Sequence, residues 1–177
     1  ALLGNSIATG AILFVIIKMF ASVSGANFNP VVSFVFFLRN EIDRNTFIYY
    51  GIIQIFSGII GVFTIHYIFE LDLIQISTNA RGTWPLLVSE IIATFGLVST
   101  ILFIRKNDES SVAIGVALFI TAGYWFTSST SFANPAVTFS RILTDTFTGI
   151  NPYSSIYFIL GQLIGSLLAY FNFKIFE

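Results

Sequence analysis

Cysteine is absent from this 177-residue sequence, and histidine and methionine occur once each. Without cysteine there can be no disulfide and no thiolate metal site. His66 is the only imidazole that could act as a base or a metal ligand. Most enzyme classes therefore lose their usual catalytic side chains, and we expect no catalytic residues, no metal and no cofactor.

Charged residues are also scarce. They make up 10% of the sequence, whereas soluble domains average about 25%. The net charge is −1 and no run of five like charges occurs, which argues against a nucleic-acid partner. Because 55% of the residues are apolar and 17% are aromatic, too little polar surface remains to cover a soluble globule. The composition predicts an integral membrane protein.

Long apolar runs predict an all-α membrane protein. A helix needs roughly 20 apolar residues to cross a bilayer, and five stretches qualify: about 2–23, 46–69, 84–104, 111–127 and 153–174. Two further apolar stretches, 31–38 and 136–143, are too short to cross and each follows an Asn-Pro pair. We interpret them as re-entrant half-helices, which a membrane tolerates where they are buried or line a polar path.

The sequence also repeats internally. Segments 24–34 and 129–139 superimpose with an offset of 105 residues, and the helices that follow them match with an offset of 108. An odd number of spans separates the halves, so they are inverted in the membrane. We predict a single transmembrane channel domain, 1–177, with a first repeat in 1–69 and a second in 84–177. No counterpart of helix 84–104 opens the first repeat, which we therefore expect to be truncated by one helix.

The positive charges predict the orientation, because cytoplasmic loops are enriched in lysine and arginine. If the first span runs from outside to inside, six of the eight positive residues fall on the cytoplasmic side: Lys18, Arg39, Arg44, Arg105, Lys106 and Lys174. We expect a multi-pass protein of the inner or plasma membrane, with the lipid bilayer around it.

The two Asn-Pro pairs, Asn29-Pro30 and Asn134-Pro135, predict a selective pore. Proline suits the first helical turn, and asparagine suits the N-cap before it. If the two N-termini meet at mid-membrane, their amide N–H groups can donate to a passing oxygen, while their dipoles oppose cations. The alternative is that each pair merely caps a helix in a loop, but two pairs in matched 105-residue frames favour the pore.

Three strings carry a family resemblance: Ser24-Gly-Ala-Asn-Phe-Asn-Pro-Val, Ser131-Phe-Ala-Asn-Pro-Ala and Glu90-x-x-x-Thr94-Phe. They resemble the two signature boxes and the fourth helix of the major intrinsic protein family, the aquaporins and glycerol channels. The resemblance implies an aquaporin-like inverted repeat, here with five full transmembrane helices plus two half-helices. It also implies a homotetramer and small neutral solutes. Val31 departs from the usual alanine, which Ala136 keeps in the second box.

The resemblance also implies a selectivity constriction formed by Thr9, Ala122, Ser131 and Val137. Water-selective relatives usually place an aromatic residue, a histidine and an arginine among these positions, so we expect a wide pore that admits polyols such as glycerol as well as water. The string from Ser131 to Arg141 further resembles bacterial aquaporins associated with arsenic resistance, which implies metalloid acids such as arsenite. The alternative is an inverted-repeat secondary transporter of a small solute.

Arg141 lies four residues after Val137, hence on the same helical face one turn farther out. We hypothesise that the filter arginine has moved to an outer vestibule, tethered by Asp145. The alternative is an interfacial arginine that extends to the headgroups.

Glu90 lies inside a predicted span, where an ionisable group suggests function. We interpret it as a structural buried carboxylate that, with Thr94 one turn away, accepts backbone N–H groups of the re-entrant loop after Phe126. A proton relay would need a second buried titratable group. We expect His66 to be a packing or interfacial residue.

Overall fold

The structure, a computed structural model, describes all 177 residues, and its regular elements are all helices, without strands. The helices are α1 (Leu2–Ser24), α2 (Pro30–Leu38), α3 (Arg44–Ile68), α4 (Trp84–Asn107), α5 (Val112–Phe126), α6 (Pro135–Ser140) and α7 (Pro152–Ile175). Two short 3-10 turns cover Glu109–Ser111 and Arg141–Leu143. Five helices are long and apolar enough to cross a membrane. The predicted all-α membrane fold with two short helices is confirmed.

The helix ends follow from local chemistry. Asp43 begins α3 by accepting hydrogen bonds from the backbone N–H groups of Asn45 and Thr46, the arrangement expected of an acidic N-cap. Asn151 does the same for α7 through the N–H of Ser154. Helix α1 is followed by Gly25, whose φ of 65° is left-handed, a conformation that costs glycine little. The predicted spans agree with these ends to within a few residues.

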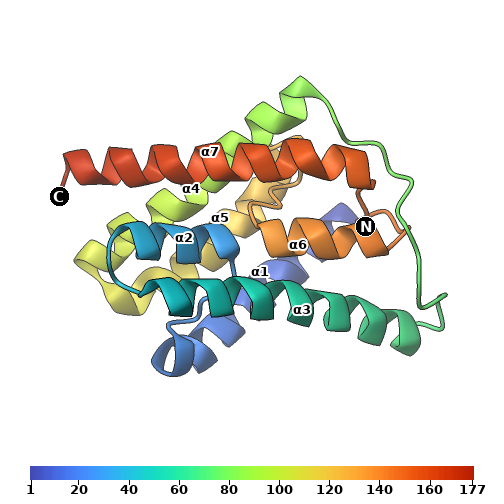
Figure 1. Ribbon diagram of the computed structural model, residues 1–177, viewed down its shortest axis with the longest axis horizontal. Helices are drawn as coiled ribbons and strands as arrows, with labels where there is room; N and C mark the ends of the chain where they lie inside the picture. Colours follow the sequence, from blue (N-terminus) through green and yellow to red (C-terminus); the bar gives the residue numbers. More distant parts are fainter.

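Figure 1 shows how the helices place the two short ones at the centre. Helices α2 and α6 lie nearly end to end, with their N-termini facing each other, between α7 on one side and α3 on the other. Helix α4 packs along α7, and α1 packs along α5. The connection 70–83, between α3 and α4, runs past the C-terminal end of α6. This arrangement holds the two Asn-Pro boxes inside the helix bundle.

Helix α4 approaches α7 closely because glycines lie at the contact. A Cβ atom on Gly161 would lie 2.7 Å from the carbonyl oxygen of Leu87, and one on Gly165 would lie 2.5 Å from that of Ile91. Small residues of this kind allow helix backbones to approach each other in membranes.

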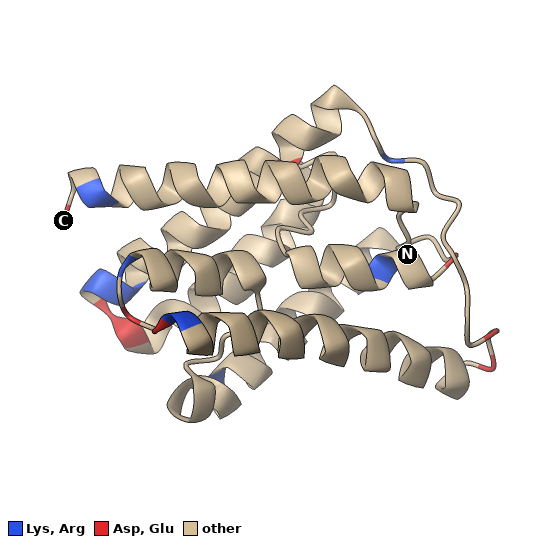
Figure 2. Cartoon of the chain, in the orientation of Figure 1, with Lys and Arg blue, Asp and Glu red and all other residues tan.

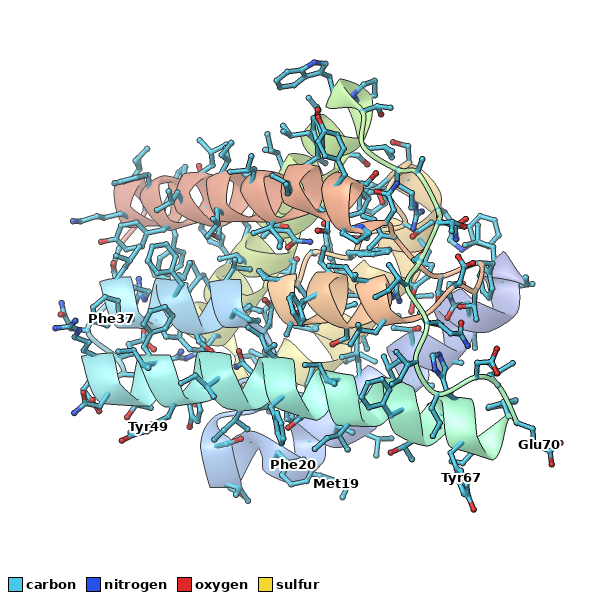
Figure 3. All side chains as sticks on the ribbon, turned by 45° about the vertical axis from the view of Figure 1, so that its right-hand side comes forward. Met19, Phe20, Phe37, Tyr49, Tyr67 and Glu70 are labelled. Atoms are coloured by element: carbon cyan, nitrogen blue, oxygen red, sulfur yellow. The ribbon has the colours of Figure 1, made fainter.

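The lipid-facing exterior is apolar and bordered by aromatic residues. Tyr49 and Tyr67 project outward near opposite ends of α3 (Figure 3), and they are 65% and 77% exposed. Eighteen residues separate them, which at a rise of 1.5 Å per residue is about 27 Å. This spacing is close to the roughly 30 Å of a bilayer's hydrocarbon core, at whose borders tyrosine is enriched.

Most charged residues gather at the two ends of the molecule (Figure 2). At one end Arg39 pairs with Glu41 at 2.6 Å and with Glu177 at 2.9 Å, and Arg105 pairs with Glu41 at 2.6 Å. Lysine and arginine at this end are those expected on the cytoplasmic side. Membrane-length helices whose charges lie mostly at their ends, with the buried Glu90 of α4 as an exception, make this a membrane protein.

Candidate functional site

Each half-helix is capped by the asparagine of its own box. The Oδ1 atom of Asn29 accepts a hydrogen bond of 3.1 Å from the N–H of Val31. The Oδ1 atom of Asn134 accepts from the N–H groups of Ala136, at 2.9 Å, and Val137, at 3.3 Å. The two asparagines thus satisfy helix donors that would otherwise be unpaired. Their side-chain carbonyls point toward their own helices, and their amide nitrogens are left to face other groups.

These amide nitrogens join the two halves. The Nδ2 atom of Asn29 donates to the carbonyl oxygen of Ala133 at 2.7 Å, and the Nδ2 atom of Asn134 donates to that of Phe28 at 3.0 Å. The two bonds are equivalent under the 105-residue offset, so each half holds the other in the same way. An amide group carries two N–H donors, and the second on each asparagine has no acceptor in the protein. Both are available to a ligand oxygen.

The segment before the second box is strained and held by Glu90. Thr130, Ser131 and Ala133 have φ values of 62°, 53° and 48°, a left-handed backbone that is costly for residues other than glycine. Glu90, which is 0% exposed, accepts hydrogen bonds from the N–H groups of Phe132 at 3.0 Å and Ala133 at 2.9 Å. These are contacts of the predicted kind, between this carboxylate and backbone N–H groups of the re-entrant loop.

Two other side chains complete the surroundings of Glu90. The Nε2 atom of Gln162 donates to Glu90 at 2.6 Å and to the hydroxyl of Thr138 at 2.8 Å. Thr94 is buried one turn along α4, but its hydroxyl makes no hydrogen bond. Thr94 therefore does not take part in the hydrogen bonding around Glu90 as expected, and Gln162 does so instead.

A cavity of about 850 Å³ lies between α1, α3 and α6. On α3 its lining includes Gln54, Ser57 and Gly61. Under the 108-residue offset these match Gln162, Gly165 and Ala169 of α7, which α4 covers. The cavity therefore occupies, in the first half, the position that α4 occupies in the second half.

The four predicted constriction residues do not surround this cavity together. Val137 lines it. Thr9 makes a 3.1 Å hydrogen bond with the hydroxyl of Tyr124, and Ala122 is exposed on α5. Ser131 is 3% exposed, and its hydroxyl has no partner. The structure thus places one of the four in the cavity and the other three outside its lining.

Arg141 also lines the cavity, but its predicted tether is wrong. No ion pair joins Arg141 to Asp145, because the carboxylate of Asp145 accepts hydrogen bonds from the N–H of Thr78 at 2.8 Å and from its hydroxyl at 3.0 Å. Helix α6 ends at Ser140, so the four-residue helical spacing does not continue beyond it. The guanidinium carbon of Arg141 instead lies 4.1 Å from the ring centre of Phe132.

The connection 70–83 has a role that its sequence does not predict. Its residue Arg81 donates to the carbonyl oxygen of Ser129 at 3.3 Å and to the hydroxyl of Thr130 at 3.4 Å. Burial lowers the pKa of Arg81, and the nearby charge of Arg141 lowers this pKa further. No motif or periodicity marks this loop, and a lone arginine in a polar segment gives no signal of its partners.

His66 is a buried packing residue that fastens the same connection. Its Nδ1 atom lies 3.0 Å from the carbonyl oxygen of Leu73, and its Nε2 atom lies 3.0 Å from the hydroxyl of Thr144. The ring therefore joins the start of the connection to the segment after α6.

Two inverted halves, each with a half-helix whose capped N-terminus meets the other inside a helical membrane bundle, define a membrane channel of the inverted-repeat class. Residues 1–109 match the sequence profile of the Major intrinsic protein family. The chain belongs to this family, as the three strings in its sequence indicate, and its members are channels and not enzymes.

Several relatives extend the match over nearly the whole chain. It is 43% identical over 169 residues to aquaglyceroporin AqpS of Rhizobium meliloti (strain 1021), an alignment that covers 96% of this chain and 72% of that protein. It is 32% identical over 180 residues to aquaporin TIP1-2 of Musa acuminata, with 95% and 69% covered. Aquaporin NIP2-1 of Oryza sativa subsp. japonica is 30% identical over 172 residues, with 93% and 56% covered.

Proposed function

We propose that this channel passes glycerol-like polyols and metalloid acids such as arsenite along with water, by passive diffusion through a wide pore. Similarity to an aquaglyceroporin and to aquaporins supports a channel for water and small uncharged solutes. The finer proposal, that polyols and metalloid acids pass, rests on the residues that would form the constriction.

The observation that carries the proposal is the position of Val137. This residue follows the second box directly, at the position where the family resemblance places the filter arginine of water-selective relatives. Its side chain offers neither a charge nor a hydrogen-bond donor, so it can neither repel cations nor bind a water strongly. The nearest cavity-lining arginine, Arg141, lies four residues farther along. At this position a solute larger than water therefore meets the apolar side chain of valine, which fills less space than an arginine side chain would.

The proposed path passes Thr9, Ala122, Ser131 and Val137 and then the two boxes. The first four are small or neutral, which favours width over water selectivity. At the boxes, the second N–H of Asn29 and that of Asn134 donate to solute hydroxyl groups in turn. The positive ends of the two half-helices oppose cations there.

We further propose that Arg141 lies in the outer vestibule and orients solutes before they enter. It lines the cavity, and its guanidinium makes no hydrogen bond or ion pair with the protein.

Stopped-flow swelling of proteoliposomes containing the full chain tests the solutes. Wild-type vesicles should admit water, glycerol and arsenous acid without saturation or dependence on an ion gradient. Val137→Arg should reduce glycerol flux roughly tenfold, a barrier increase of about 1.4 kcal/mol, and reduce water flux much less. Val137→Ala is the size control and should keep the wild-type ratio. Equal losses of glycerol and water flux in Val137→Arg would contradict the proposal.

We also propose that the chain is one channel domain, with repeats in 1–69 and 84–177, and that it forms a homotetramer in the inner or plasma membrane. The family to which it belongs supports this assembly. Chemical cross-linking in native membranes, read by mass, should give species up to four copies. Cross-linked species of no more than two copies would contradict the tetramer.

A further inference from the structure

We propose that Arg81 is a positioning residue for the constriction: it holds the segment 129–133 so that Ser131 is set at the solute path, and thereby helps to determine which solutes pass. This inference rests on the proposed function, because Ser131 is one of the four residues assigned to the constriction. Arg81 belongs to neither Asn-Pro box but to the connection between the two halves.

Arg81 holds this segment on both sides of Ser131. Its Nη2 atom donates to the carbonyl oxygen of Ser129 at 3.3 Å and to the hydroxyl of Thr130 at 3.4 Å. Beyond Ser131, the guanidinium carbon lies 5.0 Å from the ring centre of Phe132, within the range of a cation–π contact. No hydrogen bond joins Arg81 to Ser131 itself, so its effect on that residue is indirect.

The segment needs such support because its backbone is strained. Left-handed φ values at Thr130, Ser131 and Ala133 persist only when surrounding contacts over-determine them. Glu90 fixes the end nearer the box through the N–H groups of Phe132 and Ala133. Arg81 is the only charged side chain that donates to the other end, at Ser129 and Thr130.

Ser131 is placed tightly between these two supports. A Cβ atom on Gly123 of α5 would lie 2.6 Å from the hydroxyl oxygen of Ser131, so even one methyl group would displace it. That hydroxyl is buried without a protein partner, although buried polar groups are normally paired. A small shift of the segment therefore changes whether this hydroxyl stays buried or becomes exposed to the proposed solute path.

Arg81 is itself fixed by the first turn of α7 and by the segment that precedes it. Its backbone N–H donates to the hydroxyl of Ser154 at 2.9 Å. Two residues earlier, Asn79 accepts from the N–H of Asn151 at 2.8 Å and donates to the carbonyl oxygen of Thr146 at 2.7 Å. No carboxylate pairs with Arg81, so its donors remain directed at the strained segment.

The test compares permeabilities of two solutes in the same vesicles. A variant that only lowers the number of folded channels reduces glycerol and water flux in proportion, whereas a displaced constriction changes their ratio. Arg81→Met keeps an unbranched apolar stem and removes the guanidinium donors, and we expect it to change the glycerol-to-water ratio at least threefold. Arg81→Lys retains the charge but not the planar fork, and should give an intermediate ratio. Arg44→Met, at the opposite end of the molecule, is the control and should leave the ratio unchanged.

A second measurement does not depend on flux. Because the chain has no cysteine, Ser131→Cys introduces a single thiol whose labelling by a small water-soluble reagent reports its accessibility. Adding Arg81→Met to that variant should change the labelling rate at least threefold. Unchanged ratio and labelling would overturn the inference about Arg81. Absence of solute flux in the wild type, with altered labelling, would instead overturn the proposed function.

Discussion

Replacing Glu90 by glutamine tests how the strained segment before the second box is held. The carboxylate is fully buried and accepts three hydrogen bonds, one at Oε1 from the N–H of Phe132 and two at Oε2 from Ala133 and Gln162. Glutamine has the same shape but only one acceptor oxygen. If that oxygen takes the Oε2 position, the amide nitrogen faces the N–H of Phe132, and that donor loses its partner.

The expected cost follows from these contacts. A hydrogen bond to a charged group contributes about 1.5–3 kcal/mol. The two bonds that remain become neutral and weaken, since charge-assisted bonds are about twice as strong as neutral ones. We therefore expect Glu90→Gln to destabilise the segment by about 2–4 kcal/mol. At about 1.4 kcal/mol per factor of ten, opening of the segment becomes at least roughly 20-fold more frequent.

Amide hydrogen exchange of the full chain in detergent or lipid measures this opening directly. Exchange at Phe132 should accelerate most, and exchange at Ala133 should accelerate less because its acceptor is kept. Glu70→Gln, on the exposed connection after α3 (Figure 3), is the matched control and should change neither amide. If both amides exchange at the wild-type rate in Glu90→Gln, the carboxylate does not hold the segment and the reasoning fails.

Two further predictions concern packing and the chain end. Gly165→Ala places a methyl group 2.5 Å from the carbonyl oxygen of Ile91 and should destabilise the protein by about 1–3 kcal/mol, visible as a lower melting temperature. A methyl group on Gly51 meets nothing within 4 Å, so Gly51→Ala should keep the wild-type melting temperature. Equal melting temperatures of the Gly165→Ala and Gly51→Ala variants would contradict close packing of α4 on α7. The hydrogen bond from Arg39 lowers the pKa of the exposed Glu177. Such a contact stabilises above the unfolded-state pKa and is lost as pH falls through the folded one, so exchange at the end of α7 should rise only below about pH 4. An increase in this exchange already at pH 6 would contradict the role of the Arg39–Glu177 contact.

The sequence was sufficient for the helices and the boxes. A bilayer requires long apolar runs, so the five spans were readable from length and hydropathy to within a few residues. The 31–38 and 136–143 stretches were recognisable because they were too short and followed Asn-Pro. The family followed from the boxes, since those residue types recur in matched frames.

Contacts made by irregular segments could not be predicted. The Arg141 to Asp145 tether failed because it assumed that helical spacing continues past Ser140, where a 3-10 turn begins. The partners of Arg81 lie 48 and 49 residues away in sequence, and no periodicity links them. The constriction residues carried over from the resemblance came from four different segments, and only Val137 lies at the cavity.

The reciprocal bonds between the boxes also have a mechanical consequence. In each half the box asparagine donates a hydrogen bond to a backbone carbonyl of the other half, at Ala133 and at Phe28. A rocking motion of one half against the other would therefore break both bonds together. Alternating access depends on such rocking. The need to break both central hydrogen bonds at the same moment favours passive flow along a fixed path over a rocking cycle.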